Sequence, residues 1–91
     1  MALFVISYDL HNQRDYPRIW QRLEELGAAK LLESLWLLDI NNSTTEVRDH
    51  LKSYIDQDDS LAVIELKQGS MWATVRAMPN GINWLKQHLR S

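Results

Sequence analysis

The chain contains no cysteine, which excludes disulfide bonds, thiolate metal sites and a cysteine nucleophile. It also lacks any apolar run of the ~18 residues that a membrane span needs, and no signal-peptide pattern follows Met1. Gly-rich phosphate loops, HExxH metal motifs and nucleophile-elbow patterns are absent too. We therefore expect a cytoplasmic protein whose function, if enzymatic, uses residues outside these motifs.

Positive charge is scarce as well, because 10 Lys and Arg stand against 12 Asp and Glu, giving a net charge of −2. This balance argues against a module that holds nucleic acid by bulk electrostatics. Contact with nucleic acid would have to be local, metal-bridged or built across a dimer. The 91 residues suffice for one small domain, and an apolar content of 45% can support its core.

The first half of the chain alternates between strand and helix patterns. Residues 2–9 form a nearly continuous apolar run that is typical of a central strand. Apolar residues then recur at helical spacing over residues 16–26, with Asp15 as the cap, Pro17 in the first turn and Gly27 at the end. The sequence therefore predicts a strand followed by a helix.

The rest of the chain predicts further strands and helices. Residues 28–40 are too apolar for a surface helix, and we predict one long strand there. A capping box, Ser43-Thr44-Thr45-Glu46, then starts a second helix. Apolar segments predict strands over residues 61–66 and 71–77, and the spacing of apolar residues over 82–90 predicts a short helix that packs on the sheet or on a partner subunit.

We assign the chain to the β-α-β-β-α-β arrangement with a helical extension, an α+β fold called ferredoxin-like, with an antiparallel sheet and two helices on one face. Residues 1–91 then form a single domain, with its core at 2–78 and the helical extension at 80–90. Right-handed crossovers place the first and third strands at the centre. The opposite sheet face would be bare, so we predict a homodimer that covers it.

Asp9 is the only acidic residue of the apolar opening segment. A carboxylate at the end of a central strand is costly to bury unless a cation, most simply a metal ion, compensates it. In a two-fold dimer, a pair of Asp9 carboxylates could hold Mg²⁺ or Mn²⁺, which would activate water and neutralise a phosphodiester. Alternatively, Asp9 begins a turn by accepting backbone hydrogen bonds.

Two neighbours of Asp9 are also candidates. Tyr8 points to the other face of a regular strand, so we predict a packing role for it rather than a catalytic one. His11 could share the side of Asp9 and act as a ligand or general base, or it could be an ordinary loop histidine. His50 and His88 lie in predicted helices and show no metal-binding spacing.

Arginines follow at regular spacing and are candidates for nucleic-acid binding. Arg14 belongs to the loop beside Asp9 and could reach the same phosphate. Arg18 and Arg22 share a face of the first predicted helix and could follow a phosphate backbone. The alternative is a solvated face on which Arg22 pairs with Glu25.

Two other segments receive a structural interpretation. Asp56, Asp58 and Asp59 resemble the start of a calcium loop, but no Gly stands at its sixth position and Lys67 occupies the twelfth. We predict that these residues break the helix and keep the turn soluble. Ser34 has no catalytic partners in the sequence, so we expect a small packing residue or a hydrogen-bond donor at a subunit contact.

With these residues assembled, the chain resembles the CRISPR-associated protein two family over residues 3–78. Its members are small ferredoxin-like nucleases and adaptors of spacer acquisition in antiviral defence. The virulence-associated protein D ribonucleases, which are toxins, share the fold and the early Tyr-Asp. The resemblance rests on the order and spacing of Phe4-Val5-Ile6-Ser7-Tyr8-Asp9-Leu10 followed by Arg14, of Gly27-Ala28, of Ser34-Leu35-Trp36 and of Asp58-Asp59-Ser60-Leu61.

The resemblance implies a Mg²⁺-dependent endonuclease that cleaves RNA or DNA, with Mn²⁺ as an alternative metal and Asp9 as metal ligand and catalytic residue at a dimer interface. Tyr8, Arg14 and Ser34 carry over as supporting positions, and an integrase-type partner is implied. The chain departs from the family in its acidic balance and in a C-terminal helix that replaces the strand lent to a partner. Two further hypotheses are a non-catalytic dimeric scaffold for nucleic acid or protein and a toxin-like ribonuclease.

Overall fold

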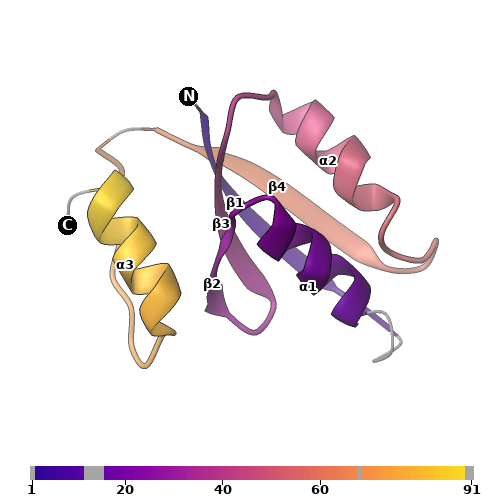
Figure 1. Cartoon of the computed structure of the whole chain (residues 1–91), viewed down its shortest axis with the longest axis horizontal. Coiled ribbons are helices and arrows are strands. Elements are labelled where there is room, and N and C mark those ends of the chain that lie inside the picture. Colours follow the sequence, from indigo (N-terminus) through magenta and orange to yellow (C-terminus); the bar gives the residue numbers. More distant parts are fainter. Residues whose placement is uncertain (1, 12–15, 68, 90–91) are drawn as a thin grey trace.

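The computed structural model describes residues 2–11, 16–67 and 69–89, and it confirms an α+β, ferredoxin-like order of elements with an added C-terminal helix (Figure 1). No helix among these residues is long and apolar enough to cross a membrane. In chain order the elements are β1 (Ala2–Asp9), α1 (Tyr16–Glu25), β2 (Ala29–Leu32), β3 (Leu35–Ile40), α2 (Thr44–Lys52), β4 (Ser60–Leu66) and α3 (Pro79–His88).

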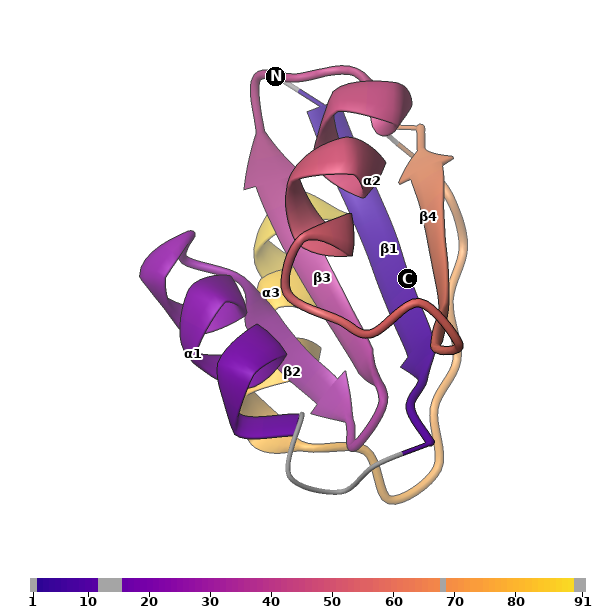
Figure 2. The ribbon, with the colours of Figure 1, turned by 90° about the vertical axis from the view of Figure 1, so that its right-hand side faces the viewer.

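The strands form one four-stranded sheet in the order β2-β3-β1-β4. Each neighbouring pair is antiparallel, and β1 pairs with β3 on one side and with β4 on the other. The first strand is therefore central, as predicted, but residues 61–66, which were predicted as the third strand and as central, form the edge strand β4. The other central strand is β3, which comes from the second half of the segment predicted as one long strand. Helices α1 and α2 lie together on one face of the sheet, and α3 lies on the opposite face (Figure 2).

Alternation along β1 divides the core between the two faces, because successive side chains of a strand point in opposite directions. Phe4 and Ile6 pack against α1 and α2, whereas Leu3 and Val5 pack toward α3. The α1–α2 side contains the larger cluster of buried residues, which includes Phe4, Ile6, Tyr8, Leu10, Ile19, Leu23, Trp36, Leu38, Val47 and Leu51. A nearly continuous apolar run is thus explained by cover on both faces.

Local signals set the ends of α1 and α2 as predicted. Helix α2 begins with the capping box, in which the Ser43 hydroxyl accepts from the Glu46 N–H at 3.1 Å and the Glu46 carboxylate accepts from the Ser43 N–H at 2.8 Å. Helix α1 is followed by Gly27 with a φ of +81°, a backbone conformation that favours glycine. The predicted cap of α1, Asp15, lies outside the described residues.

The single strand predicted over residues 28–40 is wrong. The chain reverses at Glu33 and Ser34, so β2 and β3 form an antiparallel hairpin with a register shift between Lys30 and Leu32. A buried hairpin and a long buried strand are equally apolar, and the residues of this turn are not the glycines or prolines that mark a reversal. Composition alone therefore did not reveal the turn.

The strand predicted over residues 71–77 is also wrong, because this segment runs irregularly from β4 to α3. Met71 is 88% exposed and Val75 is 71% exposed, whereas Trp72 and Ala77 pack against the cluster under α3. Some apolar residues of this segment thus pack on the cluster without strand pairing. Helix α3 begins at Pro79, earlier than the predicted start at residue 82, because proline suits the first position of a helix.

The sheet face that was predicted to be bare is covered by α3. Leu37 of the sheet packs there with Trp84, Leu85 and Leu89, and Leu31 and Leu3 belong to the same buried cluster. The argument for a homodimer through this face is therefore lost, since the chain covers the apolar residues itself. A dimer would need a different surface.

Helix α3 contacts the sheet closely at its first turn. Gly81 is buried there, and a Cβ atom added to it would lie 2.5 Å from the Leu31 Cα. The Met78 N–H, just before the helix, donates to the Leu31 carbonyl at 2.9 Å. The absence of a side chain at Gly81 is thus what permits this approach of α3 to β2.

The last turn of α3 is joined to β3 by His88. Its Nε2 lies 3.1 Å from the Asp39 Oδ2, its Nδ1 lies 2.9 Å from the Trp84 carbonyl oxygen, and its ring stacks on the Trp84 indole at 4.2 Å between centroids. The second oxygen of the Asp39 carboxylate is buried without a hydrogen-bond partner among the described residues. His88 is thus the side chain through which this carboxylate is linked to α3.

We expect Gly81→Ala to destabilise the protein by about 1–3 kcal/mol, because overpacking forces α3 away from the backbone of β2. Urea unfolding measures the change, and dye binding reports the exposed apolar face. Asn83→Ala, at an exposed position of the same helix, is the matched control and should be nearly neutral. Equal stability of both variants would contradict close docking of α3.

Candidate functional site

Asp9 ends β1 with an exposed side chain, in register with Ser60 at the start of β4. It lines a shallow hollow of about 210 Å³ with Ser7, Ser60 and Ala62, among others. Within the described residues its carboxylate has no hydrogen-bond partner. The alternative turn role depends on the following loop, which includes residues 12–15 outside the described part, so this role stays a prediction.

Antiparallel pairing of β1 with β4 brings a second acidic segment to this end of the sheet. We call Asp56, Asp58 and Asp59 the acidic loop; carboxylate oxygens from the three lie within 4.8 Å of one another. Asp59 immediately precedes Ser60, the register partner of Asp9. The sequence had predicted only a structural role for the acidic loop, because the pairing of these strand ends is not visible in local sequence.

Asp59 also ties the loop after β1 to the loop before β4. One of its oxygens accepts from the His11 N–H at 2.8 Å and the other from the Asp56 N–H at 2.9 Å. These backbone hydrogen bonds, the one from His11 above all, lower the pKa of the Asp59 carboxyl. Asp59 is therefore held as a carboxylate in the position that joins both loops.

The donor set at this end of the sheet suits a hard cation. Carboxylates from Asp9 and the acidic loop offer oxygen ligands, and Mg²⁺ usually takes one or two of these while retaining several waters. His11, which is exposed, lies two residues beyond Asp9. One chain thus supplies both Asp9 and further carboxylates, whereas the sequence had suggested a second Asp9 from a partner.

Tyr8 packs in the core, as predicted, and its hydroxyl is the centre of a hydrogen-bond cluster. The hydroxyl accepts from the Trp36 indole N–H at 2.9 Å and from the Trp20 indole N–H, and it donates to the Glu33 carbonyl at 3.0 Å. Burial raises the pKa of the Tyr8 phenol above its ordinary value of 10.0, although the two indole donors lower it in part. The phenol is thus a neutral structural group.

A hollow of about 420 Å³ lies beside this cluster, and we call it the aromatic hollow. Ser34 lies in the turn between β2 and β3, where its carbonyl accepts from the Tyr8 N–H at 3.3 Å, rather than within a strand as predicted. Ser34 therefore connects the residue before Asp9 with the aromatic hollow. The lining residues of the aromatic hollow are Tyr16, Pro17, Trp20, Glu33 and Ser34.

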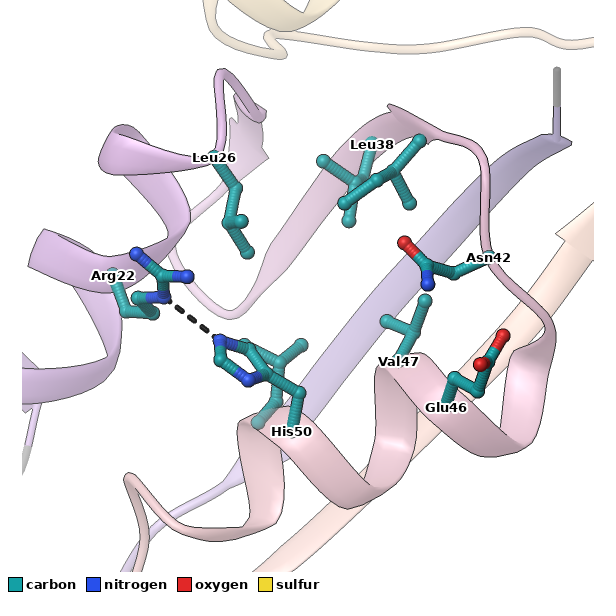
Figure 3. Close-up of a pocket in the computed structure, with 9 residues that line it drawn as sticks. Arg22, Leu26, Leu38, Asn42, Glu46, Val47 and His50 are labelled. Atoms are coloured by element: carbon teal, nitrogen blue, oxygen red, sulfur yellow. Dashed lines mark hydrogen bonds between the residues drawn. The ribbon is translucent and has the colours of Figure 1, made fainter.

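Arg18 and Arg22, which were predicted to bind nucleic acid, instead form hydrogen bonds with α2 or the residue that follows it. Arg18 is exposed and donates to the Ser53 carbonyl at 3.0 Å, and Arg22 donates through Nε to the His50 Nε2 at 2.8 Å (Figure 3). The predicted pairing of Arg22 with Glu25 is present at 3.4 Å. Arg14 lies outside the described residues, so its position near Asp9 stays a prediction.

A further cavity, of about 330 Å³, lies between α1 and α2 near Arg22 and His50 (Figure 3). Because the Arg22 guanidinium can only donate, the His50 Nε2 must be an acceptor, and a neutral His50 ring carries its proton on Nδ1. Ile40 and Asn42 also line this cavity, and Ile40 pairs with Ala2 at the start of β1. The cavity therefore lies at the end of the sheet opposite Asp9.

We expect Tyr8→Phe to lower the free energy of unfolding by about 1–3 kcal/mol, because the indole N–H groups of Trp20 and Trp36 lose their acceptor. Tyr54→Phe, at a half-buried position after α2, is the control. Because the pKa of the Tyr8 phenol is raised in the folded state, the stabilisation that the neutral phenol gives the protein is complete below pH 10.0. This stabilisation is lost as the pH rises through the raised folded-state pKa. Denaturant unfolding of both variants at rising pH should show that only Tyr8→Phe removes part of the alkaline loss.

The lowered pKa of the Asp59 carboxyl makes the stability of the fold depend on pH in the acidic range. Its stabilisation is present above the ordinary value of 3.8 and is lost as the pH falls through the lower folded-state value. We expect the melting temperature of Asp59→Asn to fall less between pH 5 and pH 2 than that of the wild type. Asp58→Asn makes the same charge change in the same loop, and an identical response of both variants would contradict the specific role of Asp59.

Neither Asp9 with the acidic loop nor the aromatic hollow corresponds to a continuous sequence motif. The residues of each come from separate elements and meet only through strand pairing and helix packing. Both arrangements therefore depend on the tertiary structure rather than on local sequence. No protein-family model matches the chain.

Proposed function

We propose that the chain is a cytoplasmic, Mg²⁺-dependent endonuclease of the CRISPR-associated type that cleaves phosphodiesters of RNA or DNA. The observation that carries this proposal is the placement of exposed Asp9 and the acidic loop at the same end of the sheet, where Asp9 is in register with Ser60 and Asp59 comes directly before Ser60. Asp9 acts as a metal ligand, and one carboxylate of the acidic loop completes the protein part of the site. Mn²⁺ can take the place of Mg²⁺ because it also accepts oxygen ligands.

The chemistry follows from the donor set. A metal bound there would lower the pKa of a coordinated water and offset the negative charge of the phosphodiester. Asp9 and the acidic loop would hold this metal at the open end of the sheet. Arg14 and Arg18 are the proposed contacts to the phosphate backbone, and they compensate locally for the acidic balance of the whole chain.

The proposed assembly is a homodimer, and the edge of β4 is a surface that can support it. This strand pairs only with β1 within the described sheet, and Ile64 on it is 60% exposed. Unpaired edge strands readily pair with another chain. An integrase-type partner remains part of the proposal for the CRISPR-associated role.

A non-catalytic scaffold that binds nucleic acid or protein is the second candidate. It is favoured by Asp59, both of whose oxygens already accept backbone N–H groups, which gives the acidic loop a structural purpose without metal. A toxin-like ribonuclease would share the proposed chemistry at Asp9 and differ in its biological role. Dependence on metal and on Asp9 therefore separates the two nuclease hypotheses from the scaffold.

We expect Asp9→Asn to reduce cleavage of end-labelled single-stranded RNA or duplex DNA at least ~100-fold, because loss of a direct ligand should exceed the 10–100-fold cost of losing an outer partner of a metal site. Each protein is assayed with Mg²⁺, with Mn²⁺ and with EDTA, after light scattering has established its oligomeric state. Asp49→Asn, an exposed change on α2, is the matched control. Cleavage that survives EDTA or Asp9→Asn would reject the metal nuclease and favour the scaffold.

A further inference from the structure

The aromatic hollow presents two aromatic side chains that are only partly buried. Tyr16 and Trp20 come from the first turns of α1, with their ring centroids 5.5 Å apart and their planes inclined at 44°. The Trp20 indole is fixed in place because its N–H donates to the buried Tyr8 hydroxyl. The hollow therefore offers a wall of aromatic surface that is formed before any ligand binds.

The opposite rim of the aromatic hollow is polar. This rim is formed by Glu33 and Ser34 in the turn between β2 and β3. The Glu33 carbonyl accepts a hydrogen bond from the Tyr8 hydroxyl, and the Ser34 carbonyl accepts one from the Tyr8 N–H. The Glu33 side chain is exposed, and its carboxylate has no hydrogen bond or ion pair among the described residues. The turn is thus held rigidly by its backbone while its carboxylate and hydroxyl stay available to a ligand.

A cation covers one face of the Trp20 ring, outside the lining of the aromatic hollow. The Lys30 ammonium lies over the Trp20 ring, 3.7 Å from its centroid, and 5.8 Å from that of Trp36. Because Lys30 occupies one face of Trp20, a ligand must meet this ring on its other face or at its edge. The ligand should therefore be flat and should bring hydrogen-bond donors to Glu33.

We propose that the aromatic hollow binds a guanine base of single-stranded nucleic acid. Unpaired bases stack on aromatic side chains and are read on their Watson–Crick edges. Guanine presents two neighbouring donors on that edge, N1–H and N2–H, which match the two acceptor oxygens of Glu33, and the Ser34 hydroxyl can donate to O6. The inference rests on the proposed function, since it specifies a base in the strand whose phosphodiester is cleaved at Asp9.

The single-stranded requirement follows from the same contacts. In a duplex, the Watson–Crick edge of guanine is already paired and its faces are stacked on neighbouring bases. A base can therefore reach both the aromatic wall and Glu33 only when it is unpaired. The hollow thus selects a strand or loop that contains an unpaired guanine.

Calorimetric titration in EDTA with the four ribonucleoside monophosphates tests this site without metal or cleavage. We expect guanosine monophosphate to bind wild type about tenfold or more tightly than the other three, as for a bidentate base contact. Glu33→Gln should remove most of this preference, and Tyr16→Ala should weaken binding of all four nucleotides. Glu65→Gln, an exposed change on β4, is the matched control for charge.

Circular dichroism confirms that each variant is folded before the titrations are compared. Equal affinity of wild type for all four nucleotides, or no binding of any, would overturn the guanine site. Binding of tetramethylammonium with no guanosine monophosphate binding would also overturn it, because the hollow would then be a cage for an alkylated amine. Retention of the guanine preference in Glu33→Gln would reject the assigned contact.

The guanine site and the proposed nuclease fail separately in these experiments. Guanine binding in EDTA without any metal-dependent cleavage would support the guanine site and reject the proposed nuclease. Cleavage that requires Asp9 but is unchanged by Glu33→Gln, together with no guanosine monophosphate binding, would keep the nuclease and reject the base site. Cleavage next to unpaired guanines that is lost in Glu33→Gln would support both the guanine site and the nuclease.

Discussion

A buried phenol needs partners for its hydroxyl, and Tyr8 finds them on separate parts of the fold. The indole groups of Trp20 and Trp36 donate to it from α1 and β3, and it donates to the Glu33 carbonyl in the hairpin turn. This one oxygen therefore sets the distance of α1 from the sheet and the position of the turn. Asp9 follows Tyr8 directly, so the candidate metal site and the aromatic hollow share the same anchor.

The two faces of the sheet are closed in different ways. Helices α1 and α2 cover one face through a continuous apolar cluster, whereas α3 reaches the other across the segment that follows β4. The small side of Gly81 and the contact of His88 with Asp39 fix the two ends of α3. Because both faces are covered within one chain, the surfaces of the described sheet that stay open include its ends and the edge of β4. The candidate functional residues lie at one of those ends.

The site was only partly visible in the sequence. Asp9 and the arginines stand out by residue type and spacing, but the acidic loop was assigned to a turn and Tyr8 to simple packing. Asp59 meets the backbone of His11 across 48 positions of the chain, and Trp36 meets Tyr8 across 28. Pairings of this kind follow from strand register, which local patterns do not reveal.

Local sequence by itself determined the capping box of α2, the end of α1 near Gly27 and the central position of β1, because each depends on neighbouring residues or on the period of apolar side chains. The tertiary structure alone decided that residues 28–40 reverse as a hairpin and that α3 covers the second face. It also decided that Asp9 and the acidic loop lie at the same end of the sheet. These outcomes depend on packing and hydrogen bonds between distant residues, whose energies no local pattern contains.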